Sequence, residues 1–316
     1  MEHFDVVVVG AGSTGGYYGA RLAQAGRDVT FLVRPNTAQM LARDGLRVIS
    51  PTHGDVFIAH PPTVLANDVH VHYDLILLTA KAYDLDAAIE SIAPAVGPGT
   101  SILPLLNGMA HMVRLDERFG AEKVLGGTSY ISSARAADGT IHHLNELETI
   151  NFGDRFEPDS TRIQAVAAAL GGANFTARLS TSILQDMWNK WASLATLAGM
   201  TCLMRASISD IAAVGGAPLS IKLYEECVAI AAAEGFAPSA KTVADRRVFF
   251  TNSPMTASML RDLESGGRIE ANHILGDLLE RGRKHALATP MLEIAYAHVR
   301  CYEERRKREK GVSVGE

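Results

Sequence analysis

Residues 5–34 read DVVVVGAGSTGGYYGARLAQAGRDVTFLVR, and this stretch decides the fold of the amino-terminal half. An apolar run at 5–9 leads directly into spaced glycines, and a second apolar run at 28–33 follows a segment of helical pattern. Such a turn lets the backbone approach a pyrophosphate closely and offers it the amides and dipole of the next helix. A dinucleotide-binding turn is therefore predicted, with its contacts made by Gly10, Gly12, Ser13, Thr14 and Gly15.

Two basic residues favour NADP(H) as the dinucleotide. The second apolar run ends on Arg34, where NAD-binding proteins usually place an acid on the ribose hydroxyls. A guanidinium there would instead pair with a 2′-phosphate. Lys81 follows the apolar run at 75–78, at a strand's carboxyl end, and its ammonium could pair with the 2′-phosphate or with a substrate carboxylate. The alternatives are a solvated arginine before Pro35 and a surface lysine.

Composition indicates a globular protein of two domains. The chain has 316 residues, of which 47% are hydrophobic and 21% charged, and its formal net charge is -5. This charge gives no general attraction to nucleic acid or to an anionic membrane. The first residues lack the pattern of a signal peptide, and the longest strongly apolar stretch, 192–204, is shorter than the roughly 20 residues of a membrane span. We therefore expect a cytoplasmic protein. The scattered cysteines Cys202, Cys227 and Cys301 indicate neither a disulfide nor a metal site.

The order of apolar segments predicts an α/β fold. Strand-like and helical segments alternate up to about residue 180, with further apolar runs at 100–105, 124–125 and 175–179, which is typical of a Rossmann-type, doubly wound, mostly parallel sheet. Residues 128–152 flank an Asp138-Gly139 hairpin signal and are expected to form antiparallel edge strands. Long helical patterns follow. The predicted domains are a dinucleotide-binding domain at 1–180 and an all-α substrate domain at 181–316.

Polar residues in both halves could carry chemistry. Asn107 follows the strand-like run 101–106, and its amide could both donate and accept near a nicotinamide, although Asn-Gly is also a common turn. Lys190 leads into the most apolar helix, where desolvation would lower its pKa toward values useful for a general acid. The alternative, which the residues alone favour, is a lysine whose stem packs on Trp191 and whose ammonium stays in water.

Two further polar residues lie toward the carboxyl end. Ser258 lies in a short helical stretch, and Glu270 begins a later helix, where an acid is ordinary helix chemistry. Glu270 and His273 have the spacing of carboxylate metal sites, but these sites need a second such motif and further acids, and the sequence offers neither. We therefore predict no metal.

Taken together, these residues resemble those of the ketopantoate reductases (2-dehydropantoate 2-reductases), and the resemblance runs over nearly the whole chain. It implies that Lys190 is the general acid and that Glu270 contacts a substrate hydroxyl. Asn107 and Ser258 would be polar groups of the substrate site, and Arg34 and Lys81 would contact the 2′-phosphate. The matching segments are 10–16, 32–34, 81–82, 106–109, 188–191 and 258–263, with Glu270, Ile274 and Gly276.

The chain departs from the family's pattern beside the expected general acid. The family usually has asparagines one and two turns after the lysine, whereas this chain has Leu194 and Ala198. After its glutamate the family has an aspartate and later an asparagine, and here Asn272 and Leu275 take these places. A more apolar substrate pocket follows, because three amides are replaced by the hydrocarbon side chains of Leu194, Ala198 and Leu275.

The expected function is NADPH-dependent reduction of a 2-oxo acid to a 2-hydroxy acid, as in the reduction of ketopantoate to pantoate in pantothenate biosynthesis. One alternative is a reductase of the same fold that acts on a more apolar 2-oxo acid, and another is an NADP-binding sensor without turnover. The partner is thus a small molecule, with no nucleic acid or membrane expected. The many alanines of the helical half would allow it to pack on a second copy, which leaves a homodimer as a further expectation.

Overall fold

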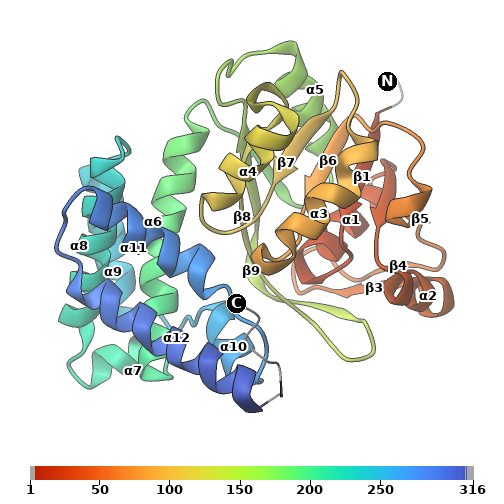
Figure 1. Cartoon of the computed structure of the whole chain (residues 1–316). Helices are drawn as coiled ribbons and strands as arrows, with labels where there is room; N and C mark the ends of the chain where they lie inside the picture. Colours follow the sequence, from red (N-terminus) through yellow and green to blue (C-terminus); the bar gives the residue numbers. More distant parts are fainter. Residues whose placement is uncertain (1–3, 310, 312–316) are drawn as a thin grey trace. The chain divides into compact units, whose positions relative to one another are not determined.

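The computed structural model describes residues 4–309 and residue 311, and these form two compact units (Figure 1). The first comprises the described parts of Met1–Leu106 and His111–Asp186. The second comprises Asn107–Ala110 and the described part of Met187–Glu316. Within the described residues, no helix has both the length and the apolar character that crossing a membrane requires.

A five-stranded parallel sheet forms the centre of the first unit. Its order is β5-β2-β1-β6-β7, so β1 (Asp5–Val9) lies between β2 (Asp28–Leu32) and β6 (Leu75–Leu78). Val6, Val7 and Val8 are fully buried, as a strand covered on both faces requires. Because the chain leaves β1 in one direction for β2 and later in the other for β6, the carboxyl end of β1 is the topological switch point, where ligands bind in such sheets. The remaining strands are β5 (Thr63–Val64) and β7 (Ser101–Pro104).

The helices of the first unit connect its strands. The first of these helices, α1, packs against strands of the parallel sheet and also against strands of a second sheet in the same unit. Tyr17 of α1 donates a hydrogen bond of 2.5 Å to Glu148, and Tyr18 lies 3.1 Å from the Ser129 hydroxyl. These buried bonds fix the helix that starts at the glycine turn. The α-helices are α1 (Ser13–Gln24), α2 (Pro35–Asp44), α3 (Leu85–Ile92), α4 (Ala110–Phe119) and α5 (Thr161–Leu170). The 3-10 helices are η1 (Ala66–Asp68), η2 (Ala82–Asp84), η3 (Ala93–Ala95) and η4 (Ala121–Lys123).

The first unit also contains a second, mixed sheet, whose strand pairing differs in part from the pairing expected from the sequence. Its order is β10-β9-β3-β4, and β8 also pairs with β9. The hairpin around Asp138-Gly139 is confirmed, but β9 pairs with three strands and is not an edge strand. Residues 175–179 were expected in the first sheet, yet their strand pairs with β9, and 124–125 forms only an isolated bridge with Ile102. The strands are β3 (Leu46–Ile49), β4 (Val56–Ile58), β8 (Gly126–Arg135), β9 (Ile141–Gly153) and β10 (Thr176–Leu179).

The described residues beyond β10 form helices, which confirms the all-α expectation (green to blue in Figure 1). Trp188 and Trp191 of α6 are almost fully buried, and Arg281 lies 5.5 Å from the ring centroid of each. This packing fixes the start of α6. The helices are α6 (Ile183–Met204), α7 (Ile208–Ala213), α8 (Ala217–Ala233), α9 (Ala240–Asn252), α10 (Ser258–Glu264), the π-helical turn η5 (Asn272–Gly276), α11 (Asp277–Lys284) and α12 (Pro290–Glu309).

Candidate active site

The glycine turn after β1 has the shape that a close ligand approach requires. Gly10 has a φ of 93°, and its N–H donates to the Leu32 carbonyl at 2.9 Å. A Cβ on Gly15 would lie 2.2 Å from the Gly10 carbonyl oxygen and 2.2 Å from the Thr79 hydroxyl, so only glycine fits there. A Cβ on Gly12, in contrast, would meet nothing within 4 Å. The turn is therefore closed on its inner side and open at Gly12.

The start of α1 is suited to a negatively charged group. Gly12 is the N-cap residue and provides no side-chain cap, and the first turn of the helix contains no acid. Ser13 and Thr14, the first two helical residues, are partly exposed. The first amides of a helix have no partners within the helix, and its dipole favours an anion at this end. The residues present therefore fit the pyrophosphate of a dinucleotide.

Arg34 and the segment containing Lys81 come together beside this turn. Arg34 is the N-cap residue of α2, and Lys81 is the N-cap residue of η2. An Arg34 guanidinium nitrogen, Nη2, lies 3.0 Å from Oδ2 of Asp84, three residues after Lys81. Sequence reasoning did not single out Asp84. The only feature of the sequence that could have indicated a role for Asp84 is its position three residues after Lys81, the predicted phosphate-binding lysine.

In the second unit, Lys190 and Asn107 form a hydrogen bond although 83 residues separate them. The Lys190 ammonium donates to Oδ1 of Asn107 at 3.1 Å. Lys190 as a residue is partly exposed, but burial around its ammonium lowers the pKa from 10.5 to about 8, and the Glu270 carboxylate acts in the opposite direction. Glu270 itself is only 7% exposed. The structure thus groups an amide, a desolvated lysine and a buried carboxylate.

The π-helical turn η5 holds this group together. Trp191 Nε1 donates to the Ile274 carbonyl at 2.9 Å, which fixes α6 against the turn that follows Glu270. Gly108 has a φ of 76°, and a Cβ there would lie 2.4 Å from the His273 carbonyl oxygen. The backbone beside Asn107 therefore rests directly on the same turn. Burial lowers the pKa of His273. Single π-turns within helices often mark functional sites.

For the other predicted substrate residues, the structure shows on which helix each one lies. Leu194 and Ala198 lie one and two turns after Lys190 on α6, so they share its face, and Ala198 is fully buried. Leu275 packs on the same helix, because its Cδ2 lies 3.8 Å from the position of a Cβ on Gly199. Ser258 begins α10, and within the described residues no hydrogen bond joins it to Lys190, Asn107 or Glu270.

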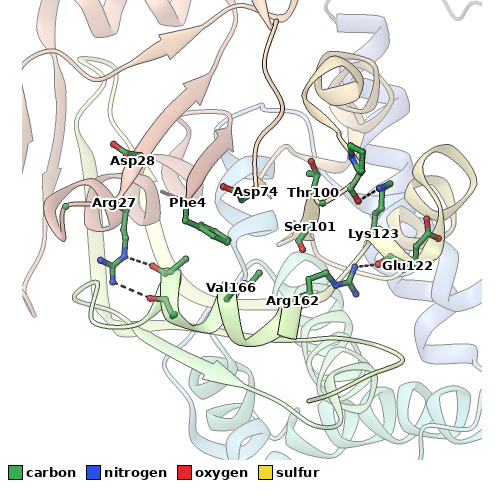
Figure 2. Close-up of a pocket in the computed structure, with 16 residues that line it drawn as sticks. Phe4, Arg27, Asp28, Asp74, Thr100, Ser101, Glu122, Lys123, Arg162 and Val166 are labelled. Atoms are coloured by element: carbon green, nitrogen blue, oxygen red, sulfur yellow. Dashed lines mark hydrogen bonds between the residues drawn. The ribbon is translucent and has the colours of Figure 1, made fainter. Parts of the chain in front are cut away.

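A pocket of about 790 Å³ lies elsewhere in the first unit, at the amino ends of the parallel strands (Figure 2). Two of the cations that line it bond to backbone carbonyls, since Arg27 donates to Ala169 and Lys123 to Pro98, both at 2.9 Å, and a third, Arg162, pairs with the Asp154 carboxylate. None of the predicted site residues lines this pocket. Among the described residues, no group of three or more His, Cys, Asp or Glu could hold a metal ion.

The fold and the glycine turn define a dinucleotide-binding protein of the Rossmann type. The chain belongs to the ketopantoate reductase family: the family model "Ketopantoate reductase PanE/ApbA" matches residues 6–156, and its C-terminal model matches residues 182–303. It is thus an oxidoreductase of a family that reduces 2-oxo acids with NAD(P)H.

Individual relatives agree over almost the full length. The uncharacterized oxidoreductase YkpB of Bacillus subtilis is 35% identical over 300 residues, which cover 94% of this chain and 98% of that protein. The crystal structure of 2-dehydropantoate 2-reductase from Geobacter metallireducens is 30% identical, with a TM-score of 0.86 and coverage of 94% and 99%. A D-mandelate dehydrogenase with NADH and anilino(oxo)acetate shares the fold at 20% identity, with a TM-score of 0.87 and coverage of 96% and 99%.

Proposed function

We propose that the chain reduces a 2-oxo acid to a 2-hydroxy acid with NADPH and that Lys190 is the general acid. The observation that carries the proposal is the Lys190–Asn107 hydrogen bond of 3.1 Å, made by a lysine whose pKa is lowered to about 8 beside Glu270. An acid whose pKa lies near the working pH transfers a proton most effectively. Snorkelling would leave the ammonium in water and its pKa near 10.4.

Each side chain of the group has a separate role in the proposed reaction. NADPH, when bound, supplies the hydride that adds to the ketone carbon. Lys190 donates a proton to the ketone oxygen as that oxygen gains negative charge, and its positive charge stabilises the transition state more than the ground state. Asn107 Oδ1 orients the ammonium, while its NH₂ group remains a hydrogen-bond donor for the substrate. Glu270 favours the protonated form of Lys190 and accepts a hydrogen bond from a distal substrate group.

Two substrates are compatible with this chemistry. Ketopantoate is supported by the family and by the Geobacter enzyme, and its reduction to pantoate would place the chain in pantothenate biosynthesis. A more apolar 2-oxo acid is favoured by the hydrocarbon side chains of Leu194, Ala198 and Leu275 on and against the helix of Lys190. We favour the apolar substrate, because a buried hydroxyl without a partner loses about 1–3 kcal/mol of binding.

The pH dependence of reduction tests the role of Lys190. Reduction needs the protonated lysine, so kcat/KM is expected to be flat below pH 8 and to fall about tenfold per pH unit above it. In a Lys190→Arg variant the guanidinium stays protonated, and the decline near pH 8 should disappear even though the rate is lower. Initial rates of NADPH oxidation between pH 6 and 10 give both profiles. A decline near pH 8 that persists in the Arg variant would contradict the assignment.

Arg34 is expected to determine the preference for NADPH. Arg34→Ala should weaken NADPH binding about tenfold or more, because a charge-assisted bond to the 2′-phosphate is lost, and should leave NADH binding unchanged. Fluorescence titration of both nucleotides measures this. The matched control is Arg43→Ala, since Arg43 is an exposed arginine of α2 that pairs with Asp44. Equal affinity of the native chain for the two nucleotides would remove the basis for NADPH.

A further inference from the structure

The Asp84 carboxylate pairs with an arginine and not with the helix that follows it. Asp84 is the last residue of η2 and directly precedes α3, where an aspartate can accept a hydrogen bond from the first amides of the following helix. Here it makes no such bond, and its Oδ2 lies 3.0 Å from Arg34 Nη2. Arg34 follows β2 and Asp84 follows β6, the two strands that flank β1. The ion pair therefore joins the two sides of the switch point, beside the glycine turn.

Stability does not account for this ion pair. The side chain of Arg34 is 70% exposed and that of Asp84 is 30% exposed. Exposed ion pairs contribute little to folding, because water and salt screen them and two side chains lose freedom. In return, α3 begins without a side-chain cap. A role in ligand binding fits these facts better, since Arg34 is also the residue that the proposed function assigns to the 2′-phosphate.

A 2′-phosphate and the Asp84 carboxylate would compete for the same cation, the Arg34 guanidinium. Arg34 can turn toward the phosphate only by giving up or sharing the Asp84 contact, and the carboxylate then lies close to a second anion. Like charges at short distance disfavour binding. NADH has a hydroxyl in place of this phosphate, and a carboxylate near that hydroxyl is the usual arrangement in NAD-binding proteins. The cost therefore applies to NADPH alone.

We infer that Asp84 is a specificity-determining residue that reduces the preference of the chain for NADPH over NADH by competing with the 2′-phosphate for Arg34. This inference rests on the proposed use of NADPH. It implies that the native chain keeps a measurable affinity for NADH. It also implies that the ratio of NADPH affinity to NADH affinity is smaller than Arg34 and Lys81 would give if Asp84 were absent.

The test is a fluorescence titration of the whole chain with NADPH and with NADH. Asp84→Asn should lower the Kd of NADPH about threefold or more, in line with the loss of an exposed ion pair and of one like charge, and should change that of NADH less than twofold. The matched control is Asp86→Asn. Asp86 lies in the first turn of the same helix and pairs with Arg114 at 2.8 Å, so this variant makes the same charge change without touching Arg34.

A double variant separates the possible failures. The gain from Asp84→Asn should vanish in an Arg34→Ala background, because the competition requires the guanidinium. If Asp84→Asn leaves the Kd of NADPH unchanged or raises it while Arg34→Ala still weakens binding, the inference is wrong and the proposed cofactor stands. A raised Kd would mean that Asp84 instead positions Arg34 for the phosphate. If Arg34→Ala has no effect on NADPH binding, the proposed cofactor and the inference both fail.

Discussion

Replacing Lys190 with alanine is expected to lower the turnover of the 2-oxo acid about 100-fold or more and to change the Kd of NADPH less than twofold. General acids typically contribute factors of this size, and the alanine variant also loses the positive charge that faces the developing alkoxide. The Kd should be retained because the predicted phosphate contacts lie in the glycine turn and at the starts of α1, α2 and η2. Single-turnover rates and nucleotide titration measure the two quantities separately.

The control for this prediction is Lys222→Ala, which removes an exposed lysine of α8. It should leave both quantities unchanged. A folded Lys190→Ala protein with normal turnover would mean that the bond to Asn107 serves packing alone and that another group donates the proton.

Introducing asparagine at Leu194 and Ala198 together is expected to shift substrate preference toward ketopantoate. The relevant quantity is kcat/KM for ketopantoate divided by kcat/KM for the best apolar 2-oxo acid. This ratio should rise about tenfold or more, since each restored polar contact is worth about 1–3 kcal/mol and the amides also disfavour an apolar chain. The native chain should use ketopantoate poorly.

Folding needs a control here, because Ala198 is fully buried. Thermal unfolding reports whether the double variant is intact, and Leu194→Asn alone, at a partly exposed position, gives the same direction of change with less strain. Ala195→Asn places an amide at an equally buried position on another face of α6 and should not change the ratio. Efficient and selective use of ketopantoate by the native chain would show that an apolar α6 face does not exclude it.

Four of the five strands of the first sheet could be predicted from local chemistry, whereas in the second sheet only the hairpin of β8 and β9 was predicted together with its pairing. The apolar run and glycines at 5–15 contain both the strand and its turn, so β1 and the start of α1 follow from the residues. β3 and β4 have only four and three residues, which is too short for a distinct strand pattern, and β3 also contains the exposed Arg47. Residues 175–179 were correctly expected to form a strand, but the residues of a parallel strand do not indicate which strand lies beside it, and here that strand is β9.

The candidate site was predictable in its residue types, while its geometry was not. The pKa of Lys190 depends on its burial in the folded chain and on the opposing charge of Glu270, 80 residues away in the sequence, and no spacing rule connects the lysine to Asn107. From the residues alone, snorkelling was the favoured interpretation of this lysine, and the family resemblance supplied the assignment. The Arg34–Asp84 pair was missed because it joins residues that follow two different strands, and only the strand order brings them together.

The most direct test of the account is NADPH oxidation, followed by absorbance, against a panel of 2-oxo acids that includes ketopantoate and branched or aromatic members. We expect that at least one 2-oxo acid is reduced to its 2-hydroxy acid, that apolar members outperform ketopantoate, and that Lys190→Ala abolishes most of the rate. Tight NADPH binding with no oxidation by any member of the panel would contradict the account and would favour a sensor without turnover.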